Sequence, residues 1–184
     1  MPSYVRRVLE AIDATSEWTG KISAFLIPGM MFIMTYEVVA RYILKSPTIW
    51  AMESTQYLFL ATTALGGAYV LLHGGHVNVP ILYSRLSTRT QAIVDVVTSL
   101  FFFFFMVALF RASWITTVEA VVYLEHSPTY WEPPIYPVYI VMTTGILLII
   151  LQGLAKLVRD LATAITGKVE TPRGIASARQ DAPR

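Results

Sequence analysis

The sequence contains no cysteine among its 184 residues. The absence of thiols excludes disulfide bonds, thiolate metal sites, iron–sulfur clusters and cysteine nucleophiles. Charge is also scarce, since Asp, Glu, Lys and Arg make up 14% of the chain, against about 25% in a typical soluble domain. The sequence has no nucleophile–base arrangement, no phosphate-binding loop and no basic nucleic-acid-binding patch. It therefore predicts a protein that is not an enzyme, needs no cofactor and binds no nucleic acid.

Hydrophobic residues, by contrast, make up 55% of the chain and are gathered into long runs. Runs of about 20 apolar residues are typical of membrane spans, and we expect an all-α integral membrane protein with four transmembrane helices. The expected crossings are residues 22–40, 50–72, 96–110 and a fourth segment that begins after Pro137 and continues to Val158. The third apolar stretch, residues 92–124, corresponds to about 50 Å of helix, so this helix should be unusually long.

The chain divides into three expected parts. Residues 1–21 are predicted to be an amphipathic interfacial helix, since Val5, Val8, Leu9 and Ile12 share one face. A frayed terminus is the alternative, whereas acidic residues in this segment disfavour a cleaved signal peptide. Residues 22–165 form the expected transmembrane domain. Residues 166–184 are polar and contain proline and glycine, which predicts a disordered cytoplasmic tail.

The distribution of Lys and Arg predicts the orientation. Eleven of these residues lie in the N-terminal segment, in the loop after the second span, and in the tail together with the end of the fourth span, where Lys156 and Arg159 lie; two lie in the first loop. Because cytoplasmic segments are enriched in cations, both termini are expected to be cytoplasmic. The remaining cation, Arg111, is expected at the outer membrane edge, where its stem can reach the interface. Aromatic residues including Trp114 and Trp131 are typical of an outer aromatic belt.

Polar residues in the spans offer few candidates for chemistry. The three histidines fall on opposite sides of the expected membrane, so no metal site is predicted. Glu37 precedes Arg41 by four residues, the favourable helical order for an ion pair. Glu53 lies in the first turn of the second span, where it suits the helix dipole and is also within reach of Arg41 across the first loop.

Small residues in the second span predict a close helix contact. Thr63 and Gly67 lie four residues apart, as do Ala64 and Ala68, with Gly66 between the two rows. Such faces let another helix approach closely, either within this chain or in another protein. The sequence alone leaves both partners open.

Several of these features, taken in order, resemble one family. Arg41-Tyr42, Trp50-x-x-Glu53, Gly66-Gly67-Ala68, Gly74-Gly75-His76-Val77-x-Val79 and Leu86 look like the small membrane subunit of tripartite ATP-independent periplasmic (TRAP) transporters. One departure is Pro80, where the family often has an acidic residue, and this bears on the subfamily.

The resemblance implies an accessory subunit of the bacterial inner membrane with no substrate site of its own. Its implied partners are a large multi-span membrane subunit, a periplasmic substrate-binding protein and membrane lipids. The complex would use sodium to take up an organic acid, and the small subunit would anchor and enlarge the fixed scaffold. The alternative is a self-contained proton-coupled exporter acting as a homodimer, which would need a carboxylate in mid-span.

Overall fold

Four long helices make up almost all of the part of the chain that the computed structural model describes, residues 3–74 and 88–166. In chain order they are α1 (Ser3–Tyr42), α2 (Ala51–Leu72), α4 (Thr88–Val122) and α5 (Tyr136–Thr166). Each contains a stretch long and apolar enough to cross a membrane. The prediction of an all-α membrane protein with four transmembrane helices is therefore confirmed.

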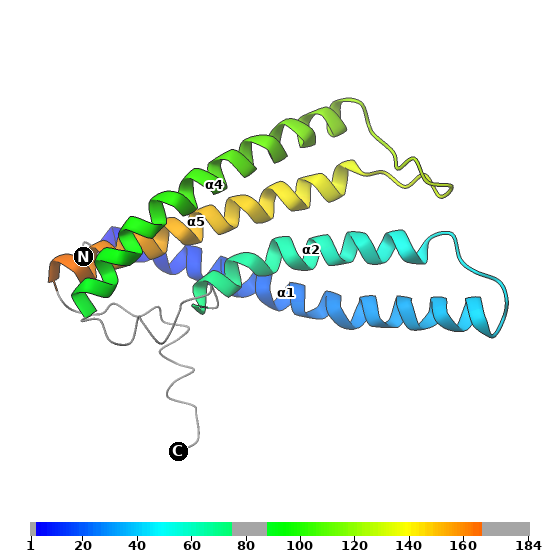
Figure 1. Cartoon of the computed structure of the whole chain (residues 1–184), viewed down its shortest axis with the longest axis horizontal. Helices are drawn as coiled ribbons and strands as arrows, with labels where there is room; N and C mark the ends of the chain where they lie inside the picture. Colours follow the sequence, from blue (N-terminus) through cyan, green and yellow to red (C-terminus); the bar gives the residue numbers. More distant parts are fainter. Residues whose placement is uncertain (1–2, 75–87, 167–184) are drawn as a thin grey trace, which may run out of the picture.

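The helices run alternately up and down, so each end of the bundle gathers one set of helix ends (Figure 1). One end, called the terminal end here, carries the start of α1, the end of α2, the start of α4 and the end of α5. The other, the loop end, carries the connections 43–50 and 123–135. Every polar cluster described below belongs to one of these ends or to the α4–α5 contact.

The packing order differs from the chain order. α1 packs against α2, α2 against α5, and α5 against α4, while the first turns of α1 also reach α5. α4 has an extended contact with α5 alone and lies at the edge of the arrangement (Figure 1). Most of its surface therefore faces lipid or another protein.

α1 is one helix of 40 residues, with Pro28 inside it. At about 1.5 Å per residue it is about 60 Å long, and it continues without interruption through the boundary predicted between residues 21 and 22. In its first half the inward side includes Asp13, Ser16 and Gly20, whereas Trp18 is 68% exposed. The buried side of this segment is mixed, because it also includes the apolar Leu9, and both polar and apolar side chains are exposed on the other side.

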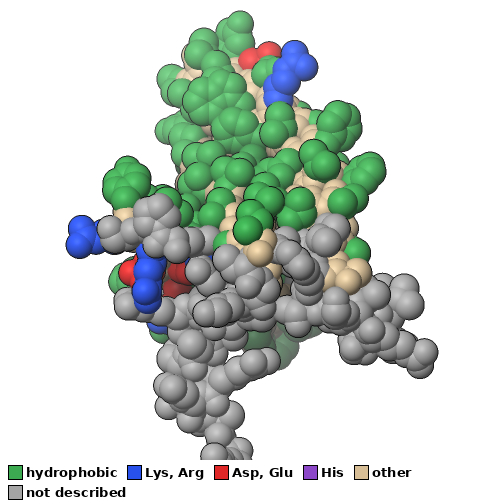
Figure 2. Space-filling model, turned by 90° about the vertical axis from the view of Figure 1, so that its left-hand side faces the viewer, with side chains coloured by type: hydrophobic (Ala, Val, Ile, Leu, Met, Phe, Trp, Pro, Cys, Tyr) green, Lys and Arg blue, Asp and Glu red, His purple; other side chains and the backbone are tan. Residues whose placement is uncertain are grey.

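Hydrophobic side chains cover much of the described surface seen from the terminal end (Figure 2). In water such a surface would cause aggregation, but it suits a protein surrounded by lipid. α4, with 35 residues, is about 52 Å long, as expected for the third apolar stretch. The predicted tail, except for Thr166 at the end of α5, lies outside the described residues.

The connection 123–135 is held by its own backbone. Ser127 N–H donates to the Pro133 carbonyl at 2.9 Å, and Ile135 N–H donates to the Glu125 carbonyl at 3.0 Å. His126 and Pro134 form an isolated antiparallel bridge. These bonds make the connection a compact cross-linked loop, and they fix the position of its tip.

Candidate functional site

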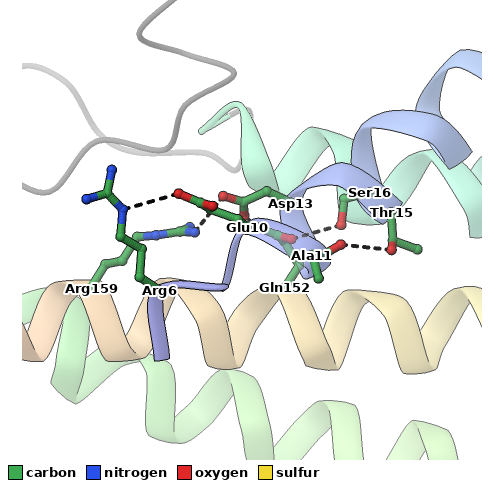
Figure 3. A network of polar contacts seen from close by, with 8 residues as sticks. All are labelled: Arg6, Glu10, Ala11, Asp13, Thr15, Ser16, Gln152 and Arg159. Carbon is green, nitrogen blue, oxygen red and sulfur yellow. Dashed lines mark hydrogen bonds and ion pairs between the residues drawn. The ribbon is translucent and has the colours of Figure 1, made fainter. Parts of the chain in front are cut away.

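A buried polar network joins α1 to α5 near the terminal end (Figure 3). Arg159 donates to Asp13 at 2.6 Å, and the two side chains are only 11% and 12% exposed. The Gln152 amide donates to the other Asp13 oxygen at 3.1 Å and accepts from the Ser16 hydroxyl at 2.8 Å. This network of four residues is called the α1–α5 clasp below.

The buried polar groups of the clasp are hydrogen-bonded to one another. Gln152 is 1% exposed and Ser16 is also 1% exposed, so water cannot replace a missing partner. Throughout the described part of the chain, every buried side-chain nitrogen or oxygen has a hydrogen-bond partner. The clasp is therefore a closed structural contact and leaves no buried polar group free to hold a solute.

At the loop end, Glu37 ties the last turns of α1 to the following connection. Arg41 donates to one carboxylate oxygen from Nε at 2.9 Å and from Nη2 at 2.5 Å. The Thr48 backbone N–H donates to the other oxygen at 3.1 Å, and the Thr48 hydroxyl also bonds to it. The predicted Glu37–Arg41 pair is confirmed, and the carboxylate is also the anchor of the 43–50 connection.

Glu53 anchors the second connection. Its carboxylate accepts from the Tyr57 hydroxyl at 2.8 Å and from the Thr129 hydroxyl at 2.6 Å. Thr129 belongs to the 123–135 loop, 76 residues away in sequence. Among the described residues Glu53 forms no ion pair with Arg41, so that predicted pairing is wrong: Arg41 is engaged by Glu37 on its own helix instead.

A row of hydroxyl groups joins α4 to α5. Thr117 donates to the Tyr139 carbonyl at 3.1 Å and bonds to the Thr143 hydroxyl at 2.7 Å. Ser113 bonds to the same Thr143 hydroxyl. Beside this row is a shallow groove of about 320 Å³ whose walls are mostly apolar and include Trp114. The hydroxyl groups bond to each other or to backbone, so the groove offers a hydrocarbon surface.

The small residues of α2 that were predicted to allow close helix contact pack mostly against other helices of this chain. A methyl group added at Gly66 would lie 3.2 Å from the Ser23 hydroxyl of α1, and one added at Gly67 would lie 2.6 Å from Ile149 of α5. Ala68 is completely buried, whereas Thr63 is exposed and bonds to the Phe59 carbonyl of its own helix. Four of the five residues, Ala64 included, thus face neighbours in this chain.

Glycines on the other helices make the same kind of contact. A methyl group added at Gly145 of α5 would lie 2.5 Å from the Ala64 carbonyl oxygen of α2, which is backbone and cannot move aside easily. One added at Gly153 of α5 would lie 2.5 Å from the Phe102 ring of α4. The sequence analysis did not single out these two positions.

Arg111, expected at the outer membrane edge, lies within α4, eleven residues before the last residue of the helix, Val122. The contacts of Ser113 with Thr143 and of Phe102 with Gly153 run antiparallel along α4 and α5. Arg111 therefore lies level with about Gly145, which contacts Ala64 in the middle of α2. The sequence did not predict this position within the bundle, because helix rise along one segment cannot show how neighbouring helices are offset.

The other predicted site residues lie apart from one another. Tyr42 is 74% exposed at the loop end, Trp50 stacks on Tyr36 with ring centroids 6.0 Å apart, and Trp114 stacks on Phe110 at 6.1 Å. Gly74 has a positive φ of 69°, which favours glycine. Gly75 and His76 lie outside the described residues. No group of three or more potential metal ligands occurs within the described ranges.

Sequence reasoning did not find the most buried polar contact. Asp13 lies in the segment that was predicted to be an interfacial helix, and Arg159 is one of the cations expected on the cytoplasmic side. The available signal was the rarity of a glutamine such as Gln152 in an apolar run, because a buried amide needs several partners. That signal indicates that partners exist but does not identify them.

Comparison with known proteins adds the family context. Residues 30–163 match the family described as tripartite ATP-independent periplasmic transporters, DctQ component. Two similar proteins come from Vibrio cholerae serotype O1. The C4-dicarboxylate TRAP transporter small permease protein DctQ is 26% identical over 61% of this chain and 47% of its own length. The sialic acid TRAP transporter small permease protein SiaQ is 23% identical over 38% of this chain and 40% of its own length. The chain thus spans less than half the length of either relative.

Proposed function

The chain belongs to the DctQ-component family of tripartite ATP-independent periplasmic transporters, and we propose that it anchors and enlarges the fixed scaffold of such a transporter. It is a multi-pass inner-membrane protein and a non-enzymatic transport component. Its proposed direct partner is a large multi-span membrane subunit. A periplasmic substrate-binding protein would deliver the solute to that subunit.

One observation carries this proposal: within the described residues, the buried polar side chains are all bonded. A pathway for an organic anion would need free cations or helix N-termini near mid-membrane, directed into a cavity. Arg111 of α4 is exposed on the side away from α5 and does not line the α4–α5 groove. The clasp, Glu37 and Glu53 instead connect helices and loops. Such an arrangement resists deformation, which is what a moving transport domain requires of its neighbour.

The solute class and the coupling ion are also part of the proposal. The names of the two relatives refer to a C4-dicarboxylate and to sialic acid, and both are organic acids. We accordingly propose uptake of an organic acid, driven by sodium. We propose that both termini lie in the cytoplasm. The terminal end of the bundle then faces the cytoplasm, and the loop end faces the periplasm.

Reconstitution tests the accessory role. Vesicles are prepared with the large subunit and the binding protein, with or without this chain, and sodium-driven uptake of the solute is measured. We expect uptake to be lost or strongly reduced without this chain, while the binding protein's affinity for its solute stays unchanged. Full uptake by the large subunit alone would overturn the proposal, as would a solute molecule bound to residues of this chain.

A further inference from the structure

Arg111 is a cation at mid-helix on a face that no other element of the described chain covers. Its side chain is exposed, and it has no ion pair or hydrogen bond to any described residue. It lies level with Gly145 of α5, near the middle of residues 133–155, a stretch of α5 and its approach without a charged residue. A charge at this depth is costly and rarely lacks a partner.

The face around Arg111 points directly away from α5. Helical spacing places Leu100, Phe104, Ile115 and Val118 on the same side as Arg111, and these four side chains are 70%, 82%, 47% and 42% exposed. The opposite side, with Ser113 and Thr117, is buried against α5. This surface, called the outer face of α4 below, is apolar apart from one central cation.

Distance excludes two other ways of accommodating the charge of Arg111, which are contact with water at the interface and pairing with a carboxylate of α4. Snorkelling to an interface serves Lys and Arg near helix ends, but Arg111 lies 11 residues before Val122, about 16 Å of helix. The acidic residues of α4, Asp95 and Glu119, are 16 and 8 residues away, about 24 and 12 Å along the axis. The described part of the chain therefore supplies no carboxylate partner to Arg111.

A second copy of the chain fits poorly. Two outer faces meeting around an axis along the membrane normal would place one Arg111 beside the other, and like charges repel strongly at low dielectric. The spans offer no carboxylate at this depth, because residues 22–36 of α1 and 54–72 of α2 contain no charged residue. Charge complementarity therefore favours a different chain that supplies the negative charge.

We propose that the outer face of α4 binds a membrane helix of another chain, which presents an Asp or Glu carboxylate to Arg111 near mid-membrane. Within the transporter this helix belongs to the large subunit, so the inference rests on the proposed function and assigns one of its interfaces. Arg suits this role because its guanidinium can donate two parallel hydrogen bonds to a carboxylate.

Photocrosslinking locates the interface. Benzoylphenylalanine replaces Phe104, on the outer face, or Phe102, which contacts Gly153 of α5, in the chain coexpressed with its large subunit. We expect an adduct with the large subunit from position 104 and none from position 102. An adduct only with lipid, or only with a second copy of this chain, would overturn the inference.

Charge variants identify the chemistry. Arg111→Gln should weaken co-purification of the large subunit about tenfold, equivalent to about 1.4 kcal/mol, whereas Arg111→Lys should retain most of it. Removing an exposed mid-membrane cation favours insertion, so the variant should fold, and helical content by circular dichroism checks this. Arg111→Glu should be rescued by changing one intramembrane Asp or Glu of the large subunit to Arg.

The outcomes separate this inference from the function on which it rests. If the wild-type chain co-purifies with the large subunit but Arg111→Gln binds equally well, the inference fails and the accessory role stands. Failure of every acidic-to-Arg change to rescue Arg111→Glu would also exclude the carboxylate. If the wild-type chain does not bind the large subunit at all, both proposals fail.

Discussion

Asp13 and Arg159 show how one residue pair can determine the path of a whole helix segment. Taking two charges out of water is costly, and the attraction between them offsets this only when the remaining hydrogen bonds are also formed. Gln152 and Ser16 complete that set. Asp13 and Ser16 in the first turns of α1 are therefore attached to α5, which directs this side of the segment into the bundle.

Arg159→Ala should destabilise the bundle strongly. The substitution leaves the Asp13 carboxylate buried without its cation, and breaking a buried ion pair costs about 3–5 kcal/mol. Thermal unfolding of the purified chain in detergent measures the loss. Arg6→Ala is the matched control, because Arg6 pairs with Glu10 while 67% exposed, and surface pairs contribute about 0–1 kcal/mol. Equal shifts for the two variants would contradict a structural role for the clasp.

Glu53→Gln should leave uptake intact. Glutamine retains a side-chain oxygen that can accept from Tyr57 or Thr129, and a group that only anchors a loop does not need to exchange protons. Uptake by reconstituted vesicles at two external pH values provides the test. The anchoring role would be wrong if the complex assembled normally but lost a proton-dependent component of uptake.

Glu53→Leu should have a different effect. It removes both acceptor oxygens and leaves the Thr129 hydroxyl without its partner, so the 123–135 loop loses its tie to α2. We expect faster proteolytic cleavage in this loop, with the four helices still formed. Cleavage at the wild-type rate would show that the loop's own backbone bonds suffice to hold it.

At the scale of the helices, close approach depends on single glycines. Gly145→Ala would place a methyl group 2.5 Å from the Ala64 carbonyl oxygen, so α5 and α2 would have to separate. Overpacking of this kind typically costs about 1–3 kcal/mol, measurable as a lower unfolding temperature in detergent. Gly29→Ala is the control, since nothing lies within 4 Å of an added methyl group there. It should leave stability unchanged or slightly raise it.

The sequence predicted helices better than contacts between them. Four apolar runs are a strong signal because any lipid-exposed span must bond its backbone internally. The Glu37–Arg41 pair was also predictable, since four residues make one helical turn. The Asp13–Arg159 pair joins residues 146 positions apart, and no local spacing reports such a contact. The depth of Arg111 required the offset between α4 and α5, which only the structure provides.

At the scale of the whole molecule, the two connections within the described residues, 43–50 and 123–135, lie at one end of the bundle. The start of α1 and the end of α5 lie at the other end (Figure 1). Reporter fusions after Ser127 and after Thr166 test the proposed orientation. We expect a periplasmic signal from the first and a cytoplasmic signal from the second, because Lys and Arg are concentrated at the terminal end. A cytoplasmic signal from Ser127 would reverse the orientation.

The clasp also has a consequence for the order of events during synthesis. Asp13 leaves the ribosome early, whereas Arg159 follows 146 residues later. At roughly 5–20 residues per second, this interval is on the order of 10 seconds. Until α5 enters the bilayer, the first turns of α1 carry an uncompensated carboxylate and are expected to remain at the aqueous surface. The translocon would thus insert the first helix in two stages, and its N-terminal turns would reach their final position only when the last helix arrives.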